Sequence, residues 1–199
     1  LEAMQERQVT VGGTTYPLPR PFLVLATQNP IELEGTYPLP EAQLDRFMFK
    51  IDIAYPSALD LEEILDRTTG LEIPEVQPLL DNAGIHEMQT LVRGVPVATP
   101  VRRYAAQLTI ATHPEHPDAP PIVKDAVRFG VSPRGAQAML LGAKTCALLD
   151  GRYNAAIADV REVVYAALRH RLILNYAAQA DDITPDMVIE QVLAHVAVP

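Results

Sequence analysis

The sequence predicts a short α/β segment followed by an all-helical domain, and three patterns along the chain indicate this fold class. Residues 22–26 form a continuous apolar run, which is typical of a strand buried on both faces, although a buried helical segment has the same composition. Residues 47–53 alternate apolar and polar side chains, as in a strand with one covered face. Beyond Pro56 the apolar residues follow helical spacing. We therefore predict the α/β part over residues 1–56 and the helical domain over residues 57–199.

The first residues predict a helical stretch and a β-hairpin. Residues 1–7 have the composition of a helix. The pair Gly12-Gly13 lies between two short runs of strand-forming residues, 9–11 and 14–16. Because adjacent glycines accept the positive φ angles of a tight turn, we expect an antiparallel hairpin here.

Helix-start signals divide the second part of the chain into a bundle of about five helices. Three signals pair a hydroxyl residue with a proline at the first helical position: Thr99-Pro100, Ser132-Pro133 and Thr184-Pro185. Further helices are expected over residues 79–93 and around residues 160–168. Residues 113–121 are rich in proline and histidine, so we expect a loop there.

The composition narrows the classes of function. The formal net charge of −9 disfavours nonspecific binding to nucleic acid, because phosphate neutralisation needs an excess of Lys and Arg. Cys146 is the single cysteine, which excludes an internal disulfide and fits a reducing compartment. No apolar run approaches the length of a membrane span. We therefore expect a cytoplasmic protein that has neither nucleic acid nor a membrane as a partner.

Asn29 is the first candidate for a chemical role. It lies just beyond the apolar run 22–26, at the end of a predicted strand, where ligands bind in open α/β sheets. Its amide both donates and accepts hydrogen bonds, so it can orient a water molecule against a phosphoryl group. The alternative is that Asn29-Pro30 only begins a turn.

Arg46 is the second candidate, at the end of a short helix that we expect to open at Pro40-Glu41. Its planar guanidinium can bridge oxygens of a transferred phosphoryl group and neutralise the charge that grows in the transition state. The alternative is a structural role, in which Arg46 compensates the helix dipole and pairs with Asp45 or Glu41.

Arg134 is the third candidate. Ser132 as the N-cap and Pro133 at the first helical position place Arg134 in the first turn of a helix. A cation there faces the positive end of the helix dipole, and a bound anion such as a nucleotide phosphate would offset this unfavourable position. The alternative is a solvated arginine.

Other residues of suitable type give weaker signals. Arg169-His170-Arg171 could form a basic patch, although such clusters are usually solvated helix faces. His113 and His116 flank a proline in the predicted loop, so we expect no metal site.

Four short motifs occur in the order in which the MoxR family of AAA-type ATPases carries them: LEAMQER at residues 1–7, ATQNP at 26–30, LDRF at 44–47 and SPR at 132–134. The chain resembles this family over nearly its whole length. The resemblance implies that residues 1–56 are the C-terminal part of an AAA+ nucleotide-binding domain. Residues 57–199 would then be the helical lid, with His170-Arg171 at the place of a similar pair in the family.

The resemblance also implies roles for the candidate residues. Asn29 would be sensor 1, Arg46 the arginine finger that completes the site of a neighbouring subunit, and Arg134 the sensor 2 residue that reports the nucleotide to the lid. The hairpin at Gly12-Gly13 would face the pore of a ring, with an ordinary surface hairpin as the alternative. The implied cofactors are ATP and Mg²⁺, and the implied assembly is a homo-oligomeric ring, hexameric as in the family.

Two family motifs do not occur in the sequence: the phosphate loop G-x-x-x-x-G-K-[ST] and an apolar strand that ends in Asp-Glu. In the family both precede the motifs found here. We therefore expect ATP hydrolysis from a protein that contains them, and none from this chain alone.

The implied function is ATP-driven, chaperone-like remodelling or maturation of partner proteins, including metal or cofactor insertion, with a von Willebrand-type protein as a partner. Two other classes stay open. One is a non-enzymatic helical adaptor in which the arginines only bind partners. The other is an AAA+ DNA motor or chelatase subunit, to which similar hairpins and fingers belong.

Overall fold

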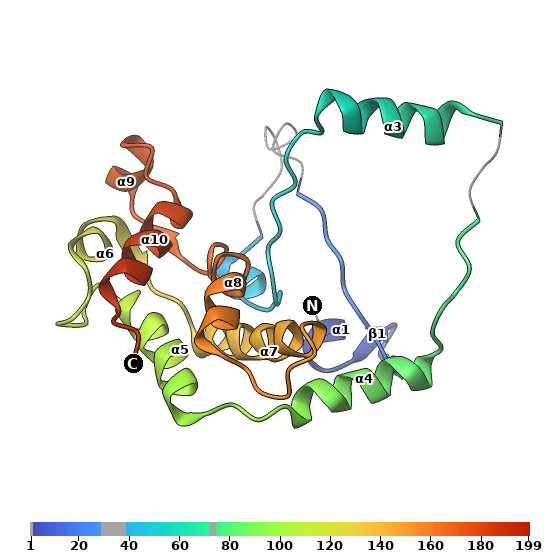
Figure 1. The fold of residues 1–199 in the computed structure, drawn as a ribbon, viewed down its shortest axis with the longest axis horizontal. Coiled ribbons are helices and arrows are strands. Elements are labelled where there is room, and N and C mark those ends of the chain that lie inside the picture. The colour runs from blue at the N-terminus through green and yellow to red at the C-terminus, as the bar shows by residue number, and fades with distance from the viewer. Residues whose placement is uncertain (1, 29–38, 72–74) are drawn as a thin grey trace.

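The computed structural model describes residues 2–28, 39–71 and 75–199. It is mainly helical with two small sheets (Figure 1), which confirms the predicted class of a core segment followed by a helical domain. No helix of the described residues is long and apolar enough to cross a membrane.

The chain begins with a short helix and the predicted hairpin. Helix α1 spans Glu2–Gln5, and strands β1 (Gln8–Val11) and β2 (Thr14–Pro17) pair antiparallel. Gly12 and Gly13 have φ angles of 59° and 81°, so the turn takes the conformation that the two glycines predicted.

The two strands predicted beyond the hairpin do not form in this chain. Residues 22–28 and 49–57 have no regular secondary structure. The predicted burial of the first segment is also wrong here, because Leu23 and Leu25 are 78% and 87% exposed. A strand is stabilised by the ladder of hydrogen bonds to its neighbours, and among the described residues no strand pairs with either segment.

Helices account for most of the remaining chain. Their bounds are α2 Glu41–Leu44, α3 Ala58–Thr69, α4 Asn82–Gly94, α5 Thr99–Ala111, α6 Pro121–Ala126, α7 Pro133–Leu149, α8 Ile157–Leu168, α9 Tyr176–Ala180 and α10 Pro185–His195. Ser132 and Thr184 cap α7 and α10 through their side-chain oxygens, as predicted. The short helices α6 and α9 were not predicted, nor was the antiparallel pair β3 (Val127–Phe129) and β4 (Ile173–Leu174).

Helices α5, α7, α8 and α10 form the core of the bundle. Their buried side chains are Tyr104 and Leu108 of α5, Met139 and Ala143 of α7, Val160, Val164 and Leu168 of α8, and Val188, Ile189 and Val192 of α10. Helix α3 has no buried residue and stands apart from this bundle (Figure 1). The predicted division of the chain at residue 56 therefore stays a prediction.

The start of α7 lies unusually close to the end of α8. A Cβ atom added at Gly135 would be 2.2 Å from Cγ1 of Val131 and 3.0 Å from Cδ2 of Leu168. Such distances are well below van der Waals contact, so only glycine fits at this point of α7 without movement of its neighbours.

Gly135→Ala should therefore destabilise the chain, because overpacking of a core site costs about 1–3 kcal/mol, more than the gain of up to about 1 kcal/mol from the better helix propensity of alanine. Gly94→Ala is the matched control, since a Cβ added at Gly94, in the last turn of α4, meets no atom within 4 Å. Urea unfolding of the two variants would measure the difference. Equal free energies of unfolding would show that the start of α7 can relax at no cost.

Candidate functional site

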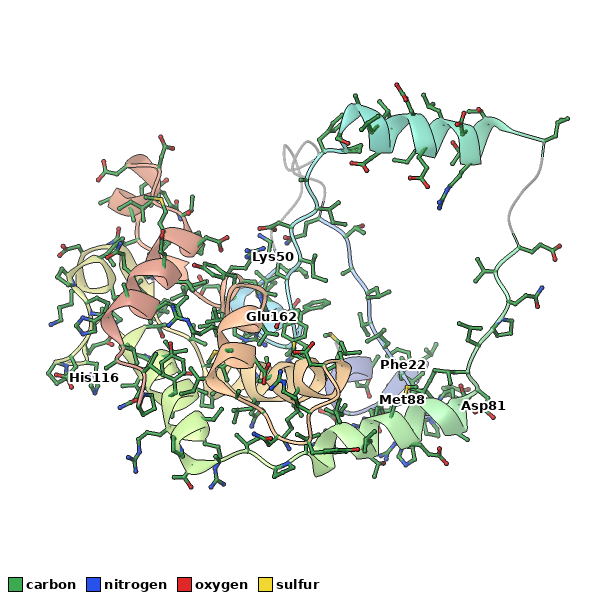
Figure 2. The ribbon with its side chains drawn as sticks, in the orientation of Figure 1. Phe22, Lys50, Asp81, Met88, His116 and Glu162 are labelled. Atoms are coloured by element: carbon green, nitrogen blue, oxygen red, sulfur yellow. The ribbon has the colours of Figure 1, made fainter. Side chains whose placement is uncertain are left out.

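Arg46 lies on a tight turn that is docked on the helical bundle. The turn follows α2, and Arg46 itself is exposed. Further along, the backbone N–H of Lys50 donates to the carbonyl oxygen of Ala166 in α8 at 2.9 Å. Figure 2 shows Lys50 beside the bundle, whereas Asp81 lies at the outer end of α4.

The ring of Phe49 also holds this segment to the bundle. It packs against the helical core, next to Gly142 of α7, where an added Cβ would lie 2.9 Å from its Cζ atom. Residues 45–50 are therefore bound to the bundle through their own backbone and side chains.

The carboxylate of Asp45 is the centre of the site. Its Oδ1 accepts a hydrogen bond from Oγ of Ser132 at 2.7 Å and another from Nε of Arg171 at 3.1 Å. Its Oδ2 accepts from Nη1 of Arg134 at 2.8 Å. Both arginines come from the helical bundle, so a single carboxylate joins the turn that carries Arg46 to two cations of the bundle.

The environment of Asp45 stabilises its charged form. Burial alone would raise the pKa of Asp45, but the hydrogen bonds from Ser132 and Arg134 and the charge of Arg171 outweigh burial, so the pKa lies below its ordinary value. Asp45 is therefore a carboxylate, and the contacts are charge-assisted.

Arg171 is the buried member of the cluster, with 5% of its surface exposed. Beyond Asp45, its guanidinium donates to the backbone carbonyl oxygens of Asp45, Phe47 and Met48, and to that of Ala167 within the bundle. Burial lowers the pKa of Arg171, and the nearby Asp45 carboxylate opposes that effect. The Arg171 guanidinium therefore binds backbone carbonyl groups of residues on both sides of Arg46.

His170 makes a second contact to the same turn. Its Nε2 lies 3.0 Å from the carbonyl oxygen of Phe47, and because a carbonyl only accepts, Nε2 carries the proton. Nδ1 is buried without a hydrogen-bond partner among the described residues. Burial lowers the pKa of His170 to about 4, with a smaller contribution from the charge of Arg171.

The expectation that residues 169–171 form a solvated helix face is thus wrong. His170 and Arg171 hold the turn, and Arg169 forms ion pairs with Asp52 at 2.7 Å and Asp186 at 2.8 Å. The three residues follow α8 directly, so they project from the end of the helix toward the extended segment.

Arg134 lies in the first turn of α7, as predicted, and its backbone N–H donates to Oγ of Ser132 at 3.2 Å. Its side chain is 43% exposed. The anion that offsets the helix dipole is the Asp45 carboxylate, so the position of Arg134 does not by itself require a bound phosphate, contrary to the sequence argument.

The other two predicted site residues are Arg46 and Asn29. The structural alternative for Arg46 paired it with Asp45 or Glu41, but the Asp45 carboxylate binds Ser132, Arg134 and Arg171. Asn29 lies outside the described residues. Arg134 contacts the carboxylate of Asp45, the residue directly before Arg46 in the chain. The catalytic roles of both arginines stay predictions.

Sequence reasoning missed Asp45, His170 and Arg171 as parts of the site. Asp45 lay inside the LDRF motif, directly before Arg46, and the His170-Arg171 pair lay at a position that the family resemblance had marked. No local pattern indicated that these two parts of the chain meet. The histidines of the loop play a structural part: Nε2 of His113 lies 3.0 Å from the carbonyl oxygen of Val131, and the described residues contain no cluster suited to a metal ion.

Two family models match the chain. The model described as ATPase family associated with various cellular activities (AAA) matches residues 1–49, and the AAA lid domain matches residues 120–192. The first match contains Asp45 and Arg46, and the second contains Arg134 and Arg171. The hydrogen bonds of Asp45 therefore connect the core match to the lid match.

Curated relatives and a solved structure align with the whole chain. Identity is 44% to the chaperone MoxR1 of Mycobacterium tuberculosis and 32% to protein MoxR of Paracoccus denitrificans. The crystal structure of a protein from Cytophaga hutchinsonii superposes with a TM-score of 0.93 at 39% identity. The chain spans 52%, 62% and 60% of these three proteins, respectively.

The fold and the matched models define an AAA-type ATPase, represented by the C-terminal part of its core and by its helical lid. Within this class the alignments decide the family. The chain belongs to the MoxR family, which confirms the resemblance seen in the motifs.

Two substitutions at the site should have very different effects on stability. Asp45→Ala removes the counter-charge of the buried Arg171 and should lower the free energy of unfolding by about 3–5 kcal/mol. Arg134→Ala removes a half-exposed partner while Ser132 and Arg171 still hold Asp45, so the loss should stay below about 1 kcal/mol. Urea unfolding of both variants measures this asymmetry. Similar losses of unfolding free energy in the two variants would mean that Arg171 can stay buried without its counter-charge.

The stability of the chain should fall as the pH falls from about 6.5, the ordinary pKa of histidine, to about 4, the pKa of folded His170. In this window the unfolded state binds a proton that the folded state does not, so acid favours unfolding. The His170 contribution should be on the order of 1–2 kcal/mol after discounting for solvent screening. Because the pKa of Asp45 is also lowered, the stability that its carboxylate contributes is lost at a lower pH than that of His170.

Urea unfolding at several pH values checks this pH dependence. His170→Gln should flatten the dependence between these limits, whereas His86→Gln, on the exposed face of α4, should not. An unchanged slope in His170→Gln would show that another group is responsible.

Proposed function

We propose that this chain belongs to an ATP hydrolase in which Arg46 and Arg134 act on nucleotide phosphate. The observation that carries the proposal is the bond from Arg134, in the lid match, to the carboxylate of Asp45, the residue directly before Arg46 in the core match. Each guanidinium is a group suited to phosphoryl oxygens, and the bond links the backbone positions of the two arginines.

Arg46 is proposed as the arginine finger. It is exposed on a turn whose neighbouring carbonyl groups are fixed by a buried arginine and a histidine. A guanidinium carried by a backbone held in this way would meet the charge that develops on the transferred phosphoryl group without reorganisation of the turn. Because the side chain is exposed, it would complete the site of a neighbouring subunit.

Arg134 is proposed to sense the nucleotide. Its guanidinium contacts Oδ2 of Asp45, and a phosphate oxygen would take the place of that carboxylate oxygen at the start of α7. The exchange would change how the lid is tied to the turn that carries Arg46, which would couple the nucleotide state to the lid.

The remaining parts of the catalytic apparatus would come from residues outside the described ranges or from motifs that do not occur in this sequence. Asn29 would orient the attacking water as sensor 1. ATP and Mg²⁺ would be held by a phosphate loop, a motif that does not occur in these 199 residues.

A finger that acts on a neighbour requires a ring, and we propose a homo-oligomer that is hexameric as in the resembled family. The name of the relative MoxR1 is that of a chaperone, which favours remodelling of partner proteins as the outcome of hydrolysis. Maturation by metal or cofactor insertion and a von Willebrand-type partner are the corresponding proposals for substrate and partner.

The test is Arg46→Ala in the protein that carries this chain together with a phosphate loop. The variant should bind ATP almost normally but hydrolyse it about a thousandfold more slowly, since a finger stabilises the transition state rather than the ground state. Arg103→Ala, which removes an exposed arginine of α5, is the matched control and should leave both properties unchanged.

Mixing then decides whether the finger serves a neighbour. Arg46→Ala subunits are combined with subunits that lack the phosphate-loop lysine, each kind inactive alone. If the finger acts in trans, some interfaces combine an intact loop with an intact Arg46, and activity returns with a maximum near equal amounts. Mixed rings, verified by native mass spectrometry, that remain inactive would exclude a trans finger.

A further inference from the structure

We propose that Arg171 is the positioning residue that holds Arg46 in its active orientation, with Asp45 as the link between the two. This inference rests on the proposed function of Arg46. It assigns to a buried lid residue a part in the reaction, although Arg171, with its side chain 2% exposed, does not reach the solvent side of the turn.

The hydrogen bonds of Arg171 exhaust its donors. A guanidinium has five N–H groups in a fixed plane. Nε donates to Oδ1 of Asp45, Nη1 donates to the carbonyl oxygens of Met48 and Ala167, and Nη2 donates to those of Asp45 and Phe47. The distances for Met48, Asp45 and Phe47 are 3.1, 3.1 and 2.6 Å, respectively.

These acceptors are arranged around Arg46 in the chain. The carbonyl groups of Asp45 and Phe47 belong to the residues immediately before and after it, and that of Met48 follows. Arg171 thus holds the peptide plane before Arg46 and the second and third planes after it. The plane between Arg46 and Phe47 is held within the turn, where the N–H of Phe47 donates to the carbonyl oxygen of Leu44 at 3.1 Å. The direction in which the Arg46 side chain leaves the backbone is therefore set by the turn that Arg171 binds.

The fold also leaves room for the Arg171 side chain beside Gly135. Its Cδ would lie 3.3 Å from a Cβ atom at Gly135, so the missing side chain in the first turns of α7 lets the stem of Arg171 pass. Lysine cannot replace this arrangement, because an ammonium offers three donors from one atom and cannot contact acceptors in a fork.

Positioning of this kind has a kinetic signature. A misplacement of about 1 Å at a catalytic group can lower the rate about 100-fold. In the protein that carries a phosphate loop, Arg171→Lys should therefore lower kcat by about 100-fold, with little change in the KM for ATP. The charge is kept, so the half-buried Asp45 retains a counter-ion.

A double-mutant cycle with Arg46→Ala tests whether Arg171 acts through Arg46. In the wild-type background Arg171→Lys should show the full loss of kcat. In the Arg46→Ala background, measured with γ-labelled ATP, it should show almost none, because the group that it positions is gone. A merely structural role would lower kcat by the same factor in both backgrounds and would overturn the proposal.

Arg152→Lys is the matched control. Arg152 also binds a buried carboxylate, that of Asp159, through Nη1 at 3.0 Å, and it lies beyond the far end of α7, about 25 Å from Ser132 by helix length. This control should leave kcat unchanged. Far-UV circular dichroism and native mass spectrometry establish that each variant is folded and assembled.

If Arg171→Lys does not fold, His170→Asn takes its place in the cycle. It removes the other side-chain donor to the carbonyl of Phe47 and leaves the buried charge intact, and it should lower kcat in the wild-type background only. The failures are distinguishable. Unchanged turnover in Arg46→Ala refutes the proposed function of Arg46 and this inference with it, whereas a normal kcat in Arg171→Lys beside an impaired Arg46→Ala refutes the positioning role alone.

Discussion

A guanidinium that is removed from water needs a counter-charge and an acceptor for each of its N–H groups, and Arg171 finds nearly all of them on one turn of the chain. The counter-charge is Asp45, and the acceptors include three backbone carbonyl groups around Arg46. A buried ion pair of this kind contributes little net stability compared with apolar packing, but it permits very few arrangements of its partners. The geometry of the turn, rather than its stability, is what this interaction determines.

The same carboxylate links the turn to the start of α7. Ser132 both caps the helix and donates to Asp45, and Arg134, two residues further on, donates to the other carboxylate oxygen. An anion that approaches Arg134 therefore competes with a charge that is already in place. Such an exchange replaces one ion pair by another, so its net free energy is small, while the connection between lid and turn changes. This is the property expected of a sensing residue, as opposed to a residue that supplies affinity.

Local features of the chain were predictable because their causes are local. The Gly12-Gly13 turn and the caps Ser132 and Thr184 depend on residues that are near in sequence, and all three were found as expected. The two predicted strands depend on neighbours that no described residue supplies. The site shows the same contrast. Motifs indicated Arg46 and Arg134. The pairing of Asp45 with Arg171 spans 126 residues, so no short stretch of the sequence predicts it.

The attachment of residues 45–50 to the bundle, through Phe49 beside Gly142 and through the bond from Lys50 to Ala166, has a mechanical consequence. Because of these contacts the turn follows any movement of the bundle. Asp52 is also paired with Arg169 of the bundle, so the extended residues beyond it, 53–57, lead away to α3. A rotation of the bundle would therefore carry the backbone of Arg46 with it, by a displacement that grows with the distance from the axis of rotation.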